Sequence, residues 1–287
     1  MSTVLVVAHH ERPEAGDLAR ATASWLHQHG HDAWVQPDDA DAHGLHDLRR
    51  EIDPASADLV VSLGGDGTML RSVTLLGGAP VPVIGVNVGL LGYLTEVEPD
   101  SLQQALSRFF SGEAAGHWEI EERMLVDVRL LRAGGNPGGR WSALNEAVVE
   151  KQESGHTVRL LVRIDGAPFT SYAADGLILA TPTGSTAYSL SARGPVLSPR
   201  LRALLLTPVS PHMLFDRSLV LDPSEDIQVE LLGHRPATLS IDGQPAAVLA
   251  EGDVVAVEPS TQVARFVRFG GRRFHQILKA KFGLTDR

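Results

Sequence analysis

The 287-residue sequence predicts an α/β N-terminal domain with a parallel, Rossmann-like sheet, followed by an all-β C-terminal domain. In roughly the first 115 residues, short continuous apolar runs alternate with segments of helical spacing, which is typical of a parallel sheet covered on both faces. After about Trp118 the pattern changes to short alternating strands separated by turn residues. We therefore expect domains at 1–117 and 118–268, with the tail 269–287 as a candidate addition to the first domain.

Each predicted element rests on a local pattern. Helical spacing of apolar residues predicts the first helix, and these residues are Leu18, Ala21, Trp25 and Leu26. In the first domain we expect strands at 3–8, 58–63 and 81–86 and helices at 13–30 and 99–112. In the second we expect strands within 156–169, 226–232, 237–246 and 253–259.

Two further segments complete the secondary-structure prediction. The glycine-rich stretch 132–140 predicts a flexible loop. The tail segment 272–283 predicts a helix with one apolar side, made of Phe274, Ile277, Leu278 and Phe282. The pairs Asp165-Gly166 and Asp242-Gly243 both lie between strand patterns, where a turn explains them, and Asp165-Gly166 predicts the turn of a β-hairpin.

Composition excludes several classes of protein. Lys+Arg of 25 against Asp+Glu of 35 gives a formal charge of -10, which disfavours nucleic acid or an anionic membrane as a partner. The chain has no cysteine, so disulfides, cysteine nucleophiles and thiolate zinc sites are excluded. The first apolar run is too short for a signal peptide, and no stretch is long enough to span a bilayer. We expect a soluble cytoplasmic protein.

The segment LVVSLGGDGTML, residues 59–70, ends an apolar strand in three glycines and a carboxylate. The carboxyl ends of the strands are where open α/β sheets bind ligands, and glycines there let the backbone approach a phosphate. A phosphate would repel Asp66 unless this carboxylate holds Mg²⁺ or takes a proton from an attacking hydroxyl. Neither the Walker pattern nor G-x-G-x-x-G is present, so the segment predicts a functional site of another kind.

Three other segments are polar or glycine-rich in unusual ways. NVGLLGYL, residues 87–94, fits a second ligand loop and a tight strand-to-helix connection equally well. Asn145 and Glu146 suit a ribose diol, although an exposed strand start is the simpler interpretation of the pair taken alone. The hydroxyl-rich stretch 175–199 favours a binding role, with Tyr188 able to stack on a base. For all twelve histidines we favour a solvated or packed side chain, although His9-His10 follows the first strand.

In this order, these segments resemble the NAD kinase family. The resemblance is carried by GGDGTML (64–70), NVGLLGYL (87–94), ERMLV (122–126), LNEAVV (144–149), DGLILATPTGSTAYSLSA (175–192) and SIDGQ (240–244). The first motif is shared by diacylglycerol, sphingosine and 6-phosphofructo-kinases, whereas PTGSTAYSLSA is much more specific. The matching segments extend across nearly the whole chain.

The resemblance implies a kinase that transfers a phosphoryl group from ATP or polyphosphate to the 2′-hydroxyl of the adenosine ribose of NAD, producing NADP. It implies an active site in the crevice between the two domains and Mg²⁺ or another divalent cation as cofactor, with no metal ligand assigned to the protein. It also implies a homodimer or homotetramer. The choice between ATP and polyphosphate, and between NAD and NADH, stays open.

The resemblance also implies roles for individual residues. Asp66 would be the general base, beside Gly65, Gly67 and Thr68, and Arg71 would approach the nucleotide phosphates. The other substrate-binding candidates are Asn145, Glu146, His156, Asp175, Thr186, Ala187, Tyr188, Ser189, Ser191 and Gln244. Among these, Asn145 and Glu146 would hold ribose hydroxyls and Asp175 would contact the nicotinamide end.

Three positions depart from the family pattern. Arg193 stands where the family usually has a glycine, Ser218 where it usually has a proline, and Ala173 where some members have a basic residue. Two rival functions are a lipid or sugar-phosphate kinase and a dinucleotide sensor without catalysis. The acidic, weakly aromatic composition argues against the first, and the presence of Asp66 argues against the second.

Overall fold

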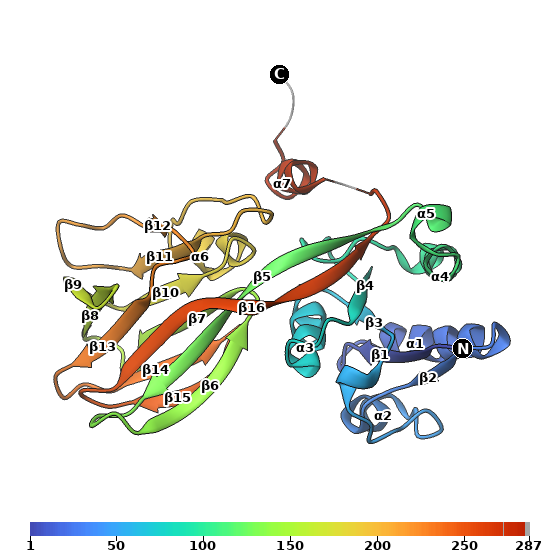
Figure 1. Cartoon of the computed structure of the whole chain (residues 1–287), viewed down its shortest axis with the longest axis horizontal. Helices are drawn as coiled ribbons and strands as arrows, with labels where there is room; N and C mark the ends of the chain where they lie inside the picture. Colours follow the sequence, from blue (N-terminus) through green and yellow to red (C-terminus); the bar gives the residue numbers. More distant parts are fainter. Residues whose placement is uncertain (272, 285–287) are drawn as a thin grey trace. The chain divides into compact units, whose positions relative to one another are not determined.

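The computed structural model describes residues 1–271 and 273–284, so Arg272 and the end of the predicted tail lie outside the described residues. The chain divides into two compact units, Met1–Glu122 with Ala264–Arg287 and Arg123–Val263. It passes between the units in two long paired strands, β5 (Glu119–Leu131) and β16 (Val254–Arg268) (Figure 1). In the described ranges, no helix combines the length and apolar character needed to cross a bilayer.

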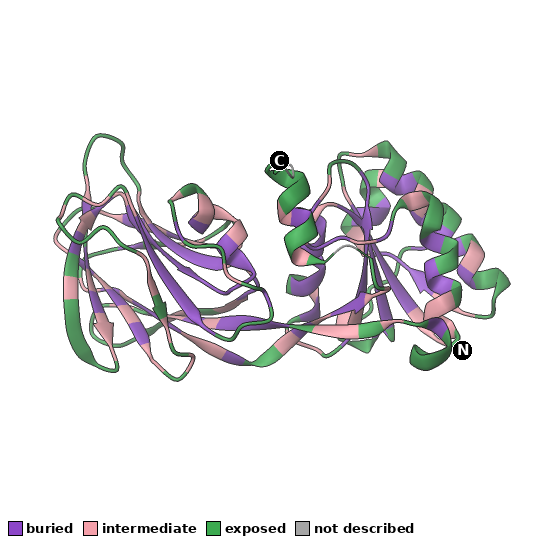
Figure 2. Ribbon diagram, turned by 90° about the horizontal axis from the view of Figure 1, so that it is seen from above, coloured by how far each residue is buried: buried purple, intermediate pink, exposed green. Residues whose placement is uncertain are grey.

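A parallel sheet forms the centre of the first unit. Its order is β2 (Asp32–Trp34), β1 (Thr3–Ala8), β3 (Leu59–Gly64) and β4 (Pro82–Asn87), and the end of β16 pairs in parallel with β4. The three strands expected from continuous apolar runs are therefore confirmed, and they are parallel as predicted. Figure 2 shows them buried between helices, which explains why they lack the alternation of a half-exposed strand.

Helices cover the sheet of the first unit. In the described residues they are α1 (Pro13–Gln28), α2 (Pro37–His43), α3 (Asp66–Leu76), α4 (Leu102–Phe110), α5 (Glu113–Gly116) and α7 (Phe274–Lys281), with 3-10 turns η1 (Pro54–Ser56) and η2 (Pro99–Ser101). The predicted helix in the tail is thus confirmed as α7. Its Ile277 is buried, whereas Phe282 is exposed and follows the helix.

The first predicted helix is confirmed as α1. Of the apolar residues that predicted it, Leu26 is buried, Leu18 and Trp25 are half-buried and packed against the core, and Ala21 is exposed. The other buried positions are small: Ala15, Gly16, Ala19, Thr22 and Ala23. Small side chains on this face let the helix approach the sheet closely.

Two antiparallel layers make up most of the second unit. One has the order β12 (Leu219–Leu221), β11 (Leu204–Val209), β10 (Gly176–Ala180), β7 (Glu146–Lys151), β14 (Ala237–Ile241) and β15 (Gln244–Leu249). The other contains β16, β13 (Ile227–Leu232), β8 (Val158–Ile164) and β9 (Ala167–Ala174), with β5 and β6 (Pro137–Ala143) joined to β16. Residues such as Leu160 and Leu177, from different layers, share one hydrophobic core. The only helical segments described here are η3 (Gly184–Thr186) and α6 (Tyr188–Ser191).

Two predicted turns are confirmed as tight hairpins, and one predicted loop is shorter than expected. Asp165-Gly166 and Asp242-Gly243 both have positive φ at each residue, as a type I′ hairpin turn requires. Of the predicted loop 132–140, residues 132–136 connect β5 to β6, whereas β6 begins at Pro137 and pairs with β5. Pairing with a neighbouring strand outweighs the low strand propensity of its glycines, which composition alone does not reveal.

Arg193 occupies a backbone position that suits glycine. It is exposed and has a φ of 65°, in the left-handed region. A side chain at such a position costs free energy that glycine avoids, which gives a physical reason for the glycine of the family pattern.

We predict that Arg193→Gly raises the free energy of unfolding by about 0.5–1 kcal/mol, because relief of the left-handed strain exceeds the added freedom of the unfolded chain. Urea unfolding followed by circular dichroism measures this difference. The matched control is Arg202→Gly, at an exposed arginine without positive φ, which should lower stability. Equal destabilisation by both variants would contradict the prediction.

Candidate functional site

The glycine-rich loop connects β3 to α3 at the carboxyl end of the parallel sheet. Gly64 is buried, and a Cβ there would lie 2.1 Å from Thr68 Oγ1, so the strand end and the first helical turn require a glycine for close packing. Gly65 and Gly67 differ, because a Cβ at either would meet nothing within 4 Å. These two glycines therefore border open space, as expected where a ligand approaches the backbone.

Asp66 is the first residue of α3, and its carboxylate is fixed by backbone groups. Its two oxygens accept the N–H groups of Tyr93 and Leu94, each at 2.9 Å. A Cβ at Gly92 would lie 2.2 Å from Asp66 Oδ1, so this glycine is needed for the approach. The segment NVGLLGYL therefore contacts Asp66 directly. It is not a tight strand-to-helix connection, because β4 ends at Asn87 and the next helical segment, η2, begins at Pro99.

A second interaction fixes the start of that segment. Arg12 Nη1 donates to the carbonyl oxygen of Val88 at 2.6 Å. Gly89 has a φ of 127°, and a Cβ there would lie only 1.9 Å from the same Nη1 atom. The loop after β4 is thus held at both ends, by Arg12 and by Asp66.

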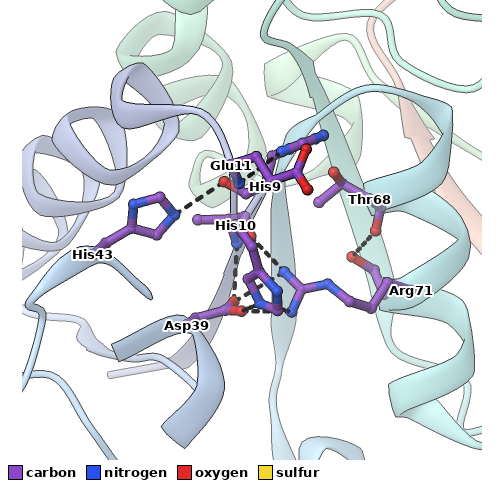
Figure 3. Close-up of polar contacts among 9 residues, drawn as sticks. His9, His10, Glu11, Asp39, His43, Thr68 and Arg71 are labelled. Atoms are coloured by element: carbon purple, nitrogen blue, oxygen red, sulfur yellow. Dashed lines mark hydrogen bonds and ion pairs between the residues drawn. The ribbon is translucent and has the colours of Figure 1, made fainter. Parts of the chain in front are cut away.

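Arg71 lies on α3, near the end of β1, and it already has a buried partner (Figure 3). Its Nη1 and Nη2 atoms lie 2.5 and 3.2 Å from the two oxygens of Asp39, and Nη2 also donates to the carbonyl of Ala8 at 2.5 Å. The side chain of Asp39 is fully buried and also accepts the N–H of Ala8 at 3.0 Å. Asp39 was not among the candidates from sequence.

In the second unit, a buried carboxylate organises the segment before β7. Asp242 accepts three successive backbone N–H groups, those of Leu144, Asn145 and Glu146, at 2.8, 2.7 and 3.0 Å. Its own N–H donates to the carbonyl of Glu146 at 2.9 Å. Sequence reasoning assigned Asp242 only to a turn, although it lies within the motif SIDGQ.

The hydroxyl-rich segment also contacts the residues that precede β7. Thr181 donates its backbone N–H to Asn145 at 2.9 Å and its hydroxyl to the carbonyl of Leu144 at 2.5 Å. A Cβ at Gly184 would lie 2.1 Å from the carbonyl oxygen of Asn145. Hydrogen bonds and close packing therefore bring the motifs LNEAVV, TPTGST and SIDGQ together, although they lie far apart in sequence.

Glu146 is 6% exposed, and its Oε2 atom is buried without a hydrogen-bond partner. Burial and the neighbouring charge of Asp242 raise the pKa of Glu146 to about 8. Burial also raises the pKa of Asp242, opposed by its three amide hydrogen bonds. We assign the proton to Glu146, because those amides stabilise the ionised form of Asp242. A neutral Glu146 can both donate to and accept from a hydroxyl group.

Tyr188 and Asp175 lie in polar contacts beside β7. The Tyr188 hydroxyl donates to Glu150 Oε1 at 3.0 Å. Burial, and to a lesser extent this hydrogen bond, raises the pKa of Tyr188 to about 12. Asp175 is paired with Lys151, with 2.6 Å between Oδ1 and Nζ. The ring of Tyr188 packs on the core formed by Val148, Ile178 and Leu205, among others, so it is a supported surface.

The remaining candidates from sequence differ in exposure. Ser189 is buried, with its hydroxyl 2.9 Å from that of Thr207, which in turn donates to Ser218 at 3.0 Å. Thr186 and Ala187 are half-buried, and His156, Ser191 and Gln244 are exposed. Asp66 and Arg71 thus belong to the first unit with their neighbours, and the candidates from Asn145 to Gln244 belong to the second.

Residues 4–114 match the family model of the ATP-NAD kinase N-terminal domain, and residues 144–269 match that of the ATP-NAD kinase C-terminal domain. The chain belongs to the ATP-NAD kinase family. The resemblance inferred from the sequence motifs is therefore confirmed.

Relatives in this family extend over the whole chain. An NAD kinase from Heliobacterium modesticaldum is 40% identical over 284 residues, covering 98% of both chains. An NAD kinase from Syntrophotalea carbinolica is 35% identical and covers 100% of both. The crystal structure of yeast NADH kinase complexed with NADH has a TM-score of 0.91 at 27% identity, covering 100% of this chain and 89% of that one. An NAD kinase from Archaeoglobus fulgidus in complex with ATP shares the fold, with a TM-score of 0.73 at 24% identity.

We predict that Asp242→Asn lowers the free energy of unfolding by about 2 kcal/mol, because an amide nitrogen replaces one of the two oxygens that together accept three part-buried N–H groups. The matched control is Asp165→Asn, at the same position of the other type I′ turn, where one exposed amide bond at 2.9 Å is affected. Asparagine tolerates the positive φ of a type I′ turn, so neither substitution should strain the backbone. Urea unfolding compares the variants, and similar losses in both would contradict a special role for Asp242.

A second prediction concerns pH. Because the folded-state pKa of Glu146 is raised to about 8, the folded protein binds this proton more tightly than the unfolded chain. Stability from this group is therefore lost as pH rises from about 5 to about 8. Glu146→Gln should match the parent at pH 5 and be more stable than it at pH 8. Urea unfolding at both values tests this, and the same stability difference at both would contradict it.

Proposed function

We propose that this protein transfers a phosphoryl group from ATP or polyphosphate to the 2′-hydroxyl of the adenosine ribose of NAD, producing NADP in the cytoplasm, with Asp66 as general base. The observation that carries the proposal is the Asp66 carboxylate. This carboxylate lies at the carboxyl end of β3, between two glycines that border open space, and two backbone N–H groups fix its position. The family relationship supports the choice of substrates.

The hydrogen bonds of Asp66 suit a base. Each oxygen accepts one backbone N–H at 2.9 Å, which leaves each with a further lone pair for a substrate hydroxyl. A fixed carboxylate needs no reorganisation when it takes the proton, and in phosphoryl transfer most of the rate enhancement comes from such positioning.

The glycines and the start of α3 would receive phosphates. Gly65 and Gly67 border open space, and α3 begins at Asp66, so its first N–H groups lie at the same edge. The N-terminus of a helix favours negative charge. Together these groups suit a pyrophosphate lying against the backbone.

A divalent cation fits this chemistry. Mg²⁺ is commonly bound by one or two carboxylates together with substrate phosphates, and Asp66 is a carboxylate with free lone pairs at this edge. When bound, Mg²⁺ would neutralise charge on the transferred phosphoryl group. Asp66 would be the residue that contacts it, with the other ligands supplied by the phosphates and water.

The second unit would hold the dinucleotide. Glu146, with its neutral carboxyl and its unpartnered Oε2, suits ribose hydroxyls together with Asn145. The half-buried ring of Tyr188 would stack on a base, beside Thr186 and Ala187. Asp175, paired with Lys151, would contact the nicotinamide end.

We also infer that the protein is a homodimer or homotetramer. The second unit exposes Leu214, and the partly exposed rings of Phe169 and Phe215 meet at a centroid distance of 5.9 Å. Exposed apolar groups that lie together are common at interfaces between subunits.

The test is NADP formation from NAD, ATP or polyphosphate, and Mg²⁺, with the parent protein and Asp66→Asn. We predict that the substitution lowers kcat by roughly 10²–10⁴-fold while the Kd for NAD changes little, because the amide cannot accept the proton. A fall of less than about tenfold would argue against a general base at Asp66.

The control is Asp58→Asn, in which an exposed carboxylate that accepts the N–H of Thr3 at 2.8 Å is changed in the same way. It should leave kcat unaltered. If the parent protein itself forms no NADP with either donor, the proposed activity is wrong.

A further inference from the structure

His10 is the third member of the cluster around Asp39 (Figure 3). It follows β1 by two residues, and the neighbouring N–H of His9 donates to Leu63 at 2.9 Å, so His10 lies beside the end of β3. Its Nε2 atom is 2.6 Å from Asp39 Oδ1 and 2.7 Å from Arg71 Nη1.

These two contacts cannot both be favourable. The guanidinium of Arg71 can only donate, whereas an ionised Asp39 can only accept. If Nε2 carries a proton, it donates to Asp39 and faces an N–H of Arg71. If Nε2 carries none, it accepts from Arg71 and faces a carboxylate oxygen. The protonation state of His10 therefore decides which of the two groups is satisfied.

Within this cluster, the two side chains that can carry positive charge are partly exposed to solvent, and the carboxylate is buried. The Asp39 side chain is fully buried, whereas those of His10 and Arg71 are 42% and 29% exposed. With neutral His10, Arg71 and Asp39 cancel in charge. With protonated His10 the cluster carries one net positive charge, on the side open to solvent.

The other titratable groups around His10 are on its own loop and on α2. Glu11 donates its backbone N–H to the ring of His9 at 3.2 Å, and the ring of His43 lies 3.0 Å from the carbonyl of His9. Figure 3 shows Asp39 as the carboxylate that His10 and Arg71 share.

We propose that His10 and Arg71, which share the buried carboxylate of Asp39, act together as a phosphate-binding pair of the nucleotide site. This inference rests on the proposed function, in which Arg71 approaches a substrate phosphate. A phosphate at Arg71 favours the protonated form of His10, and protonated His10 satisfies Asp39 and releases Arg71 Nη1 for the ligand. By linkage, affinity for the phosphate rises as pH falls through the range in which histidine gains a proton.

The experiment measures the Kd of NAD by calorimetry at pH 6 and pH 8, since the pyrophosphate of NAD does not titrate in this range. We expect about three- to tenfold tighter binding at pH 6 in the parent protein. In His10→Gln the Kd should change less between the two pH values than in the parent protein, and at pH 8 it should be similar to that of the parent. The change that remains is expected from Glu146, whose pKa is raised to about 8.

Two controls isolate the pair. His46→Gln removes an exposed histidine 3.8 Å from Asp41, a similar pair elsewhere in the unit, and should keep the pH dependence of the parent. Adenosine, which has no phosphate, should show the same pH dependence in the parent protein and in His10→Gln, because any such dependence comes from Glu146 at the ribose. A parallel series with ATP and Mg²⁺ shows which substrate's phosphate is bound, because only that nucleotide should have a Kd that depends on His10.

The proposal is wrong if His10→Gln keeps the pH dependence for both nucleotides, or if the parent protein has none. It is also wrong if His10→Gln reduces the pH dependence of adenosine binding as much as that of the nucleotides. These are binding measurements on the full chain, so a failure to form NADP would count against the kinase activity and would leave the test of His10 intact.

Discussion

The candidate site depends on hydrogen bonds between the Asp66 carboxylate and the backbone of Tyr93 and Leu94. These bonds join the ends of two neighbouring parallel strands, because Asp66 follows β3 and the two amides follow β4. They restrict the residues around them: Gly92 leaves no room for a Cβ, and Gly64 leaves none beside Thr68. The same bonds therefore fix the positions of the proposed base, of the proposed phosphate loop and of the glycine segment after β4 relative to one another.

The same physical arrangement occurs twice more. Asp242 accepts three successive amides before β7, and buried Asp39 accepts an amide of β1 together with the guanidinium of Arg71. Hydrogen bonds to a charged acceptor contribute about 1.5–3 kcal/mol each, which helps to offset the cost of burying the carboxylate. In all three places a carboxylate fixes the backbone next to one end of a strand. The groups proposed to contact substrate lie in or beside these fixed segments.

Sequence patterns predicted three strands of the parallel sheet and the two aspartate-glycine turns, because these depend on local apolar runs and on φ at single residues. They did not predict the short strand β2 or the pairing of the end of β16 with β4. The same reasoning identified Asp66, since a strand-to-helix turn alone does not require a carboxylate among three glycines. It missed Asp242, because an Asp-Gly turn between strands already accounts for that residue. It missed Asp39 because the partner, Arg71, is 32 positions away, and no local pattern reports such a pairing. The spacing of apolar residues predicted helix α1, but it did not show that small residues such as Ala15 and Ala19 are buried with them, since closeness to the sheet depends on the fold.

The two departures from the family pattern at Arg193 and Ser218 are accommodated inside the second unit in different ways. Arg193 keeps the left-handed conformation of a glycine and places its side chain at the surface, so the neighbouring Gly194, where a Cβ would lie 2.2 Å from Ser189 Oγ, can still pack closely. Ser218 supplies a hydroxyl that proline lacks, and this hydroxyl accepts a hydrogen bond from buried Thr207, which in turn contacts Ser189. Both changes therefore converge on Ser189, directly after Tyr188. One change preserves the packing of Gly194 against Ser189, and the other adds a hydrogen-bond partner to Thr207, which contacts Ser189, so the surroundings of Ser189 accommodate both departures.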